Sequence, residues 1–243
     1  MLINIMTWNT ALTDSISNGK EPGNIEYIKG FIDNNANGLA ILQEIPYKDA
    51  NNNLNVHKTF GRIRNEMPDE QGYKFFHNLN YNNGRIVMFT TIITKIKDVD
   101  PSEELVYPLG TPKNRESAVS IKVDKDRQLT VLGIHAQNGR DTRGYLKALD
   151  NIKRKPQIIA GDFNAGDYYC ENRDTFQSIL SDYVNICNLP TRKDPDSQRL
   201  TCIDHIFVDR SIVTKCSDLI IHTDINSDRI YSDHFPITFK LEY

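Results

Sequence analysis

The chain has 243 residues, a length that suits a single domain if that domain is a sandwich or a barrel. Hydrophobic residues make up 39% of the sequence and charged residues 25%, as in an ordinary soluble globular protein. The formal net charge of −3 excludes a strong attraction of the whole surface to nucleic acid or anionic membrane, although a hydrolase can still act through a local patch and a metal.

The N-terminus and the cysteines bear on the compartment of the protein. The first residues enter strand-like sequence at once, without the basic and apolar regions of a signal peptide. No apolar run approaches the roughly 18 residues of a membrane-spanning helix. The four cysteines, Cys170, Cys187, Cys202 and Cys216, lie far apart without a CxxC pair, which predicts free thiols. We therefore expect a cytoplasmic monomer without integral membrane association, or a secreted protein if a signal peptide has been trimmed.

The N-terminal third predicts two buried strands with a helix between them. Residues 2–8 alternate as a strand, and residues 38–44 form a second apolar run that ends in a carboxylate. Between them, a turn-rich loop at 18–23 precedes apolar residues at helical spacing, and this helix should end near Asn34. Residues 48–68 have weak periodicity, so we expect a long surface loop with a short helix at most.

The middle third predicts mostly strands. Residues 82–84 contain an Asn-Gly step, which is typical of a tight hairpin turn, and residues 124–127 form a charged turn. A helix is predicted at 139–154, with its apolar side chains inward. The predicted strands lie at 73–77, 84–94, 98–107, 116–123 and 128–135.

The C-terminal third begins with an apolar run at 158–164 that ends in Gly-Asp-Phe-Asn, which predicts a buried strand delivering polar groups at its end. A helix near 174–180 and a charged loop at 190–198 follow. Arg192 and Lys193 in this loop could flank a substrate groove, but charged loops are usually solvated, so we expect them to be merely solvated. Further strands are predicted at 202–208, 212–222 and 235–241. Many strands with few helices indicate two sheets packed together with helices outside, as one domain over residues 1–243.

The apolar runs share one property, because each finishes in a carboxylate, a carboxamide or an imidazole. A single such ending is common, since loops are solvated. Hard cations prefer oxygen ligands, however, and an imidazole held by a carboxylate keeps the tautomer that a general base needs. Together the endings therefore indicate a catalytic site with a metal. The residues concerned are Asn9, Glu44, His135, Asp162 with Asn164, Asp204, and Asp233 with His234.

Five motifs resemble those of the endonuclease/exonuclease/phosphatase superfamily: Thr7-Trp8-Asn9, Leu42-Gln43-Glu44, Gly161-Asp162-Phe163-Asn164, Ile203-Asp204-His205-Ile206 and Ser232-Asp233-His234-Phe235-Pro236-Ile237. They occur in the order of that family and span residues 7–237. The resemblance implies an α/β fold, namely a four-layered α/β/β/α sandwich of two mixed sheets flanked by helices, as in deoxyribonuclease I. It also implies hydrolysis of a phosphoester with Mg²⁺ or Mn²⁺ as the cofactor.

Within the superfamily, the chain resembles the deoxyribonuclease I, sphingomyelinase and inositol phosphatase branches more than the abasic-site endonucleases. His135 stands where the abasic-site branch typically has a Tyr-x-x-Asn pattern, and residues 115–119 are similar to the strand whose arginine touches phosphate in deoxyribonuclease I. No branch is matched in every motif. Ile203-Asp204-His205 replaces the Cys-Asp-Arg of inositol phosphatases, and the arginine that follows the glutamate of deoxyribonuclease I is absent after Glu44.

The resemblance therefore implies a Mg²⁺-dependent phosphodiesterase, and we expect a nuclease that hydrolyses DNA or RNA. A phosphatase or phospholipase C-type hydrolase stays open, with an inositol phosphate, a sphingomyelin-like lipid or another small phosphoester as substrate. A catalytically inactive binding protein is disfavoured, because every motif keeps its reactive side chain.

The resemblance assigns catalytic roles to five residues in an in-line attack of water on the phosphodiester. His234 would take the proton of the water, and Asp204 would orient His234. Asp162 and Asn164 would orient the nucleophile and donate to the developing charge. His135 would hydrogen-bond a non-bridging phosphate oxygen or protonate the leaving oxygen. The alternative for Asp204 and His234 is a buried Asp–His bond that is only structural, and the alternative for His135 is a core histidine at the end of a strand.

The remaining assignments concern the metal and the phosphate. Glu44 and Asn9 would hold the cation, with Asp233 as a further carboxylate beside it. Asn9 could instead cap the turn that follows it. Arg115 would clamp the phosphate, and the alternative for Arg115 is a surface ion pair with Glu116 or its neighbours.

Overall fold

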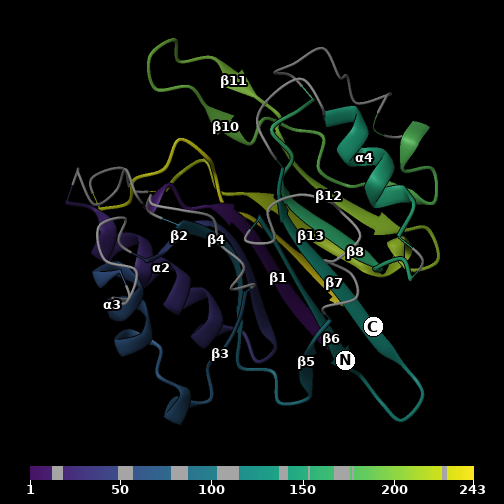
Figure 1. The fold of residues 1–243 in the computed structure, drawn as a ribbon, viewed down its shortest axis with the longest axis horizontal. Helices are drawn as coiled ribbons and strands as arrows, with labels where there is room; N and C mark the ends of the chain where they lie inside the picture. Colours follow the sequence, from purple (N-terminus) through teal and green to yellow (C-terminus); the bar gives the residue numbers. More distant parts are fainter. Residues whose placement is uncertain are drawn as a thin grey trace.

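The computed structural model describes residues 1–12, 19–48, 57–77, 87–102, 115–136, 142–152, 154–166, 176, 178–225 and 229–243. Two six-stranded sheets pack face to face, and helices lie against both outer faces (Figure 1). Each sheet is mixed, because one parallel pair of strands lies among antiparallel neighbours. The four-layered α/β/β/α sandwich that the family resemblance implied is therefore confirmed.

The first sheet has the N-terminal strand near its centre. Here β1 (Leu2–Asn9) pairs in parallel with β2 (Gly38–Lys48) and antiparallel with β14 (Ile237–Glu242). The outer strands are β13 (Cys216–Ile221) beside β14, then β4 (Val87–Thr94) and β3 (Lys74–Phe76) beyond β2. Because β14 ends the chain and β1 begins it, both ends of the sequence lie in one sheet.

Two helices cover the outer face of this sheet. Apolar side chains of α2 (Glu21–Asn34) and α3 (Lys58–Glu66) pack with Trp8 and Leu42 in one buried cluster. The helix α2 begins at Glu21, inside the predicted loop, because the proline that follows suits the first turn of a helix. It ends at Asn34, as predicted. A short 3₁₀ helix, η1 (Asp69–Gln71), follows α3.

The second sheet contains the other parallel pair, β7 (Gln128–His135) and β8 (Ile158–Asp162). Its outer face is covered by α4 (Thr142–Asp150), whose Leu146 and Leu149 are buried against it. The remaining strands, in spatial order, are β5 (Val99–Pro101) and β6 (Glu116–Lys122) on the β7 side, and β12 (Asp204–Asp209) and β9 (Tyr183–Asn185) on the β8 side.

Two short elements lie outside the main sheets. A hairpin of β10 (Arg192–Lys193) and β11 (Leu200–Thr201) projects from one end of the sandwich, at the top of Figure 1. A 3₁₀ helix, η5 (Val213–Lys215), precedes β13. Among the helices that the structure describes, none is long and apolar enough to cross a membrane.

Several predicted boundaries are wrong. The strand β2 continues four residues past Glu44, β12 begins at Asp204 rather than at 202, and β14 begins at Ile237. The loop predicted at 190–198 contains β10, and the strand predicted from 212 begins only at Cys216. The Asn-Gly turn at 82–84, residues 103–107, residues 174, 175 and 177 of the helix predicted at 174–180, and Cys170 lie outside the described residues.

Gly161 marks the tightest backbone approach beside β8. Its φ angle of +146° is rare for other residues, and a Cβ atom there would lie 2.0 Å from the carbonyl oxygen of Ile134. We expect Gly161→Ala to lower the free energy of unfolding by roughly 2–4 kcal/mol, measured by urea denaturation. Gly61→Ala is the control, because a Cβ there meets nothing within 4 Å. Equal stability of the two variants would contradict this packing.

His77 predicts a pH dependence of stability. Its ring packs against Tyr47, Phe60 and Phe89, and burial there, with the charge of Arg64, lowers the pKa of His77 to about 4. The unfolded chain, with a histidine pKa of about 6.5, binds the extra proton first as the pH falls. The stabilisation is therefore complete above pH ~6.5 and is lost as the pH falls towards ~4, by about 3 kcal/mol.

The measurement for His77 compares two unfolding curves as a function of pH. His77→Phe keeps an aromatic ring in the cluster but removes the titrating group, so its free energy of unfolding should fall less steeply between pH ~6.5 and ~4 than that of the wild type. If the free energies of unfolding of the two proteins fell in parallel with pH, His77 would not contribute to the pH dependence of stability.

Candidate active site

Strand register explains why polar residues of four strands meet between the sheets. In β7, Val131 lies in the core between the sheets, so the two-residue period of a strand turns His135 the same way. The same alternation turns Asn9 in β1, Asp162 in β8 and Asp204 in β12 inward. Because His135 and Asp204 each pair directly with Asp162, the three residues form one row at one edge of the second sheet.

Glu44 reaches the same place through a bulge. Strict alternation along β2 would turn Glu44 towards the helices, since Leu42 already faces them. The register between β2 and β4 shifts between Leu42 and Ile45, and Glu44 has a φ angle of +59°. This bulge brings the Glu44 carboxylate to the Asn9 amide, whose Nδ2 donates to Oε1 at 3.3 Å. A non-glycine residue in this strained conformation is typical of functional sites.

His234 is positioned by the segment that leads into β14. The backbone N–H of His234 donates to Ser232 Oγ, and Ser232 Oγ donates to the carbonyl oxygen of Asn9 at 2.7 Å. The indole N–H of Trp8 donates to the carbonyl oxygen of His234 at 3.0 Å. These bonds tie His234 to the end of β1, so the two sheets contribute to one site.

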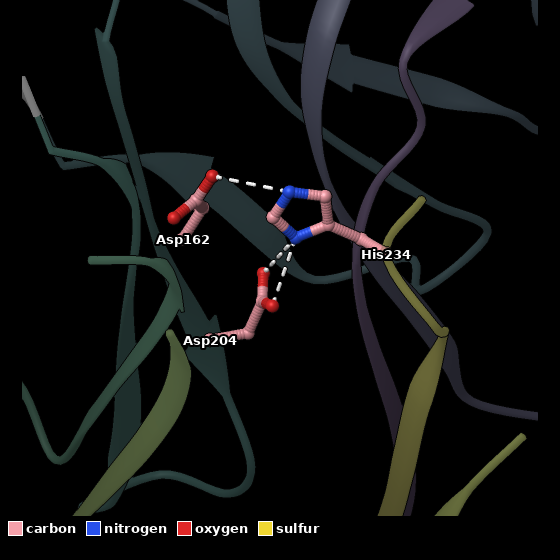
Figure 2. A group of neighbouring side chains, drawn as sticks. All are labelled: Asp162, Asp204 and His234. Carbon is pink, nitrogen blue, oxygen red and sulfur yellow. Dashed lines mark hydrogen bonds and ion pairs between the residues drawn. The ribbon is translucent and has the colours of Figure 1, made fainter. Parts of the chain in front are cut away.

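The His234 ring lies between two carboxylates (Figure 2). Its Nδ1 donates to Asp204 at 2.9 Å from Oδ2, and its Nε2 lies 3.9 Å from Asp162 Oδ2. Thr191 Oγ1 also donates to Asp204 Oδ2, at 2.7 Å. Burial alone would lower the pKa of His234, but the carboxylates of Asp204 and Asp162 outweigh burial and raise that pKa to about 10. This arrangement favours a protonated ring with a fixed orientation.

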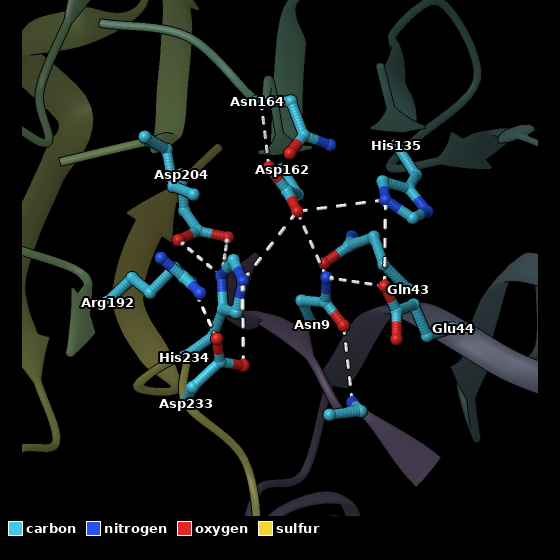
Figure 3. A network of polar contacts seen from close by, with 12 residues as sticks. Asn9, Gln43, Glu44, His135, Asp162, Asn164, Arg192, Asp204, Asp233 and His234 are labelled. Atoms are coloured by element: carbon cyan, nitrogen blue, oxygen red, sulfur yellow. Dashed lines mark hydrogen bonds and ion pairs between the residues drawn. The ribbon is translucent and has the colours of Figure 1, made fainter. Parts of the chain in front are cut away.

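Asp162 is the centre of the network shown in Figure 3. Its Oδ2 accepts from Asn9 Nδ2 at 3.0 Å, and its Oδ1 accepts from the backbone N–H of Asn164 at 2.7 Å. Burial raises the pKa of Asp162 to about 7, despite the opposing effect of His234 and of these hydrogen bonds. Asn164 has a φ angle of +51°, and its Nδ2 donates to the carbonyl oxygen of Ala136 at 2.9 Å.

His135 lies on the other side of Asp162. Its Nε2 is 3.7 Å from Asp162 Oδ2 and 3.9 Å from Glu44 Oε1. Burial, with the charges of Arg115 and His234, lowers the pKa of His135 to about 3, so the ring is neutral near pH 7. Arg115 donates from Nη1 to the backbone carbonyls of His135 and Ala136, at 3.2 and 3.3 Å.

Asp233 and Arg192 form the opposite wall. Arg192 Nε donates to Asp233 Oδ2 at 2.6 Å, and Asp233 Oδ1 lies 3.9 Å from His234 Nε2. Lys193 in β10 donates its backbone N–H to the carbonyl oxygen of Asp233 at 2.7 Å, so the hairpin is fixed against the His234 segment. The expectation that Arg192 is merely solvated is wrong, because only 13% of its side chain is exposed.

These side chains surround an open, polar pocket of about 300 Å³. All the predicted site residues line it except Asp204, which lies behind His234. Two other described histidines lie away from the pocket: His205 is buried against Ala165 and Asn185, and His77 lies in the aromatic cluster. The lining residues are Asn9, Ala11, Glu44, Met88, Arg115, His135, Asp162, Asn164, Arg192, Ile203, Asp233 and His234.

The donor set of the pocket fits a hard divalent cation. Glu44 and Asp162 bring two carboxylates to the Asn9 amide, whose Nδ2 donates to both. Carboxylate oxygens are the ligands that Mg²⁺ and Mn²⁺ prefer. Asp162, Asp204 and His234 also offer ligand atoms within 4.8 Å of one another, but His234 and Asp204 already bond each other there. The carboxylates that remain open to a cation therefore lie on the Glu44 side of Asp162.

Sequence reasoning missed three residues that hold the site together. Thr191 and Arg192 stand in a run of charged and turn-forming residues, where no periodicity indicates that they approach Asp204 and His234. Asn24 is fully buried in α2, and its side chain bonds the backbone of both Thr10 and Tyr231. For Asn24, the available signal was a polar residue at a position that the helical spacing places on the buried face.

Comparisons with known proteins agree with this geometry. The sequence model of the Endonuclease/Exonuclease/phosphatase family matches residues 6–234. A search of curated proteins found no match. Among solved structures, the 3′-5′ exonuclease NExo from Neisseria meningitidis is 15% identical, with a TM-score of 0.66 over 99% of this chain and 100% of that chain.

Two further structures are similar at the level of the fold. The AP endonuclease LMAP from Leishmania major is 17% identical, with a TM-score of 0.66 over 100% of this chain and 88% of that chain. D. rerio TDP2, solved with a single-strand DNA product, is 16% identical, with a TM-score of 0.63 over 100% of this chain and 99% of that chain. At these identities the similarity shows a shared fold.

Proposed function

The chain belongs to the endonuclease/exonuclease/phosphatase family, and we propose that it is a divalent-cation-dependent nuclease that hydrolyses phosphodiester bonds of DNA or RNA. The observation that carries the proposal is the row of His135, Asp162 and Asp204 with His234 and Glu44 packed against it, in a pocket open to solvent. Solved structures of the same fold include proteins described as nucleases and one bound to a DNA product, which supports nucleic acid as the substrate class.

In the proposed mechanism, His234 accepts the proton of the attacking water at Nε2. Asp204 holds the opposite ring nitrogen at 2.9 Å, and Thr191 fixes the carboxylate of Asp204 in turn. This support sets the tautomer and the direction of the ring before substrate arrives. Asp162, which lies 3.9 Å from Nε2, and Asn164, whose backbone bonds Asp162, are positioned to orient the same water.

The phosphate would be bound from the opposite side of Asp162. His135 is neutral, so its ring can donate one hydrogen bond to a non-bridging or leaving oxygen without placing a full charge beside Glu44. Arg115, held by the carbonyls of His135 and Ala136, brings a permanent positive charge to that wall. The two residues together stabilise the charge that develops on the phosphoryl oxygens.

Glu44 and Asn9 would hold the divalent cation, with Asp162 and Asp233 as neighbouring carboxylates. When bound, Mg²⁺ or Mn²⁺ would polarise the phosphoryl oxygen and offset the carboxylates that favour a protonated His234. Asp233 already accepts a hydrogen bond from Arg192 through Oδ2, which leaves Oδ1 facing the pocket.

The test incubates the protein with Mg²⁺ and supercoiled plasmid, and separately with single-stranded DNA and RNA. We expect conversion of at least one nucleic acid, and its loss on chelation with EDTA. In parallel, the same protein is given an inositol phosphate and a sphingomyelin analogue. The net charge of −3 favours such small substrates over nucleic acid. Their hydrolysis with every nucleic acid left intact would replace the nuclease by the phosphatase or phospholipase alternative.

Other expectations stay predictions. We propose that residues 1–243 form one domain, because strands from both ends of the chain share a sheet. We propose a cytoplasmic monomer, which the free thiols of Cys187, Cys202 and Cys216 support. Size-exclusion chromatography with light scattering measures the oligomeric state.

A further inference from the structure

Arg192 lines the pocket but has no role in the mechanism above. Two carboxylates hold its guanidinium group, at 2.6 Å from Asp233 and 3.5 Å from Asp194. The backbone beside it is fixed as well, because Phe235 donates its N–H to the carbonyl oxygen of Thr191 at 2.7 Å. A long side chain that is ordered in this way loses little conformational freedom when it binds a ligand.

The charge of the pocket shows what Arg192 can contribute. Glu44, Asp162 and Asp233 present carboxyl groups to the space that a negatively charged phosphodiester must enter. Among the described residues that line the pocket, Arg115 and Arg192 are the arginines, and no lysine lines it. A substrate with several phosphates therefore finds a fixed positive charge at these two positions.

The two arginines lie on opposite flanks of the site. Arg115 bonds the backbone at the end of β7, whereas Arg192 lies beside Asp233 and the β12 end of the row. Figure 3 shows Arg192 and His135 on opposite sides of Asp162 and His234. The strands β7 and β12 are separated by β8, so two spacings of about 4.8 Å put the flanks roughly 10 Å apart. One phosphate group is too small to contact both.

We propose that Arg192 binds a phosphate next to the one that is attacked, and so makes the site prefer a nucleotide chain over a small phosphodiester. The inference rests on the proposed function, since it assigns the attacked phosphate to the space between His234 and the side chains of His135 and Arg115. Arg192 would bind the neighbouring phosphate by the planar, forked donors that suit phosphate oxygens. Asp233 then keeps Arg192 in place for this contact.

The test compares two substrates and two variants. Arg192→Gln should raise KM for an oligonucleotide at least about tenfold, and leave kcat/KM for bis(p-nitrophenyl) phosphate, which has one phosphate, within about twofold. Arg199→Gln, which removes an exposed arginine of the same hairpin, should change neither substrate. Arg192→Lys keeps the charge and should restore part of the oligonucleotide binding.

A binding measurement gives the second readout. Fluorescent oligonucleotide is titrated into His234→Ala and into His234→Ala/Arg192→Gln at several salt concentrations. The slope of log Kd against log salt should be smaller by about one in the double variant, because one phosphate contact is lost. Urea denaturation of each variant checks that the fold is intact.

The outcomes separate this inference from the proposed function. If Arg192→Gln left KM for the oligonucleotide and the salt slope unchanged, the phosphate contact would be overturned. An equal loss of kcat/KM on both substrates would overturn it as well, and would instead assign Arg192 to the support of Asp233 and His234. A wild-type protein that hydrolyses the small diester but no oligonucleotide would overturn the nuclease function itself.

Discussion

Replacing His234 by alanine should lower kcat on the best nucleic-acid substrate by about 10²–10⁴-fold, the range that a general base contributes. The effect follows from the position of the ring, which is held at Nδ1 by Asp204 and presents Nε2 to the pocket beside Asp162. No other histidine among the described residues can replace it, because His135 lies beyond Asp162 and takes part on the phosphate side. Steady-state kinetics with Mg²⁺ measures the change.

The control for His234 is His222, which is half-buried and bonds Thr238 at 2.8 Å, outside the pocket. We expect His222→Ala to retain activity within about twofold. Because His234 is buried, the urea denaturation curve of His234→Ala is recorded as well. A folded His234→Ala variant that keeps more than a tenth of the wild-type kcat would rule out this residue as the base.

The second large effect is expected for Glu44→Gln. The change keeps the size of the side chain and removes its negative charge, so the pocket should need at least about tenfold more Mg²⁺ for half-maximal activity. Isothermal titration with Mg²⁺ gives the affinity, and activity as a function of Mg²⁺ concentration gives the kinetic counterpart. The bulge in β2 should persist, because it depends on the register with β4.

Glu70→Gln serves as the matched control for Glu44→Gln. Glu70 lies exposed in η1, away from the pocket, so its loss should leave the Mg²⁺ requirement unchanged. Equal Mg²⁺ affinities of Glu44→Gln, Glu70→Gln and the wild type would contradict the role of Glu44 as a ligand. The cation would then have to be held by other residues of the row.

Strand alternation is the physical reason that so much of the site could be predicted from sequence. Apolar residues at every second position fix which face of β7 and β8 lies in the core, and His135 and Asp162 continue that face to the edge. The predicted strand at 128–135 therefore matches β7 at both ends. Side-chain chemistry and the family motifs supplied the rest of the residue set.

Local pattern could not predict the bulge at Glu44 or the place of Arg192. The bulge depends on how β2 pairs with β4, which begins more than forty residues later. Arg192 lies in a charged stretch like many solvated loops, and its contact with Asp233 spans 41 residues. Asn24 bonds Tyr231 across 207 residues. Such contacts arise from tertiary packing, and the periodicity of the sequence does not predict them.

Cleavage of DNA and RNA oligonucleotides in water labelled with heavy oxygen tests the central claim most directly. The products formed with Mg²⁺ are analysed by mass spectrometry, for the wild type and for His234→Ala. If water attacks the phosphodiester, each new terminal phosphate carries one heavy oxygen, and His234→Ala forms almost no product. Intact oligonucleotides, or an unlabelled or cyclic phosphate at the cleaved end, would contradict hydrolysis at this site.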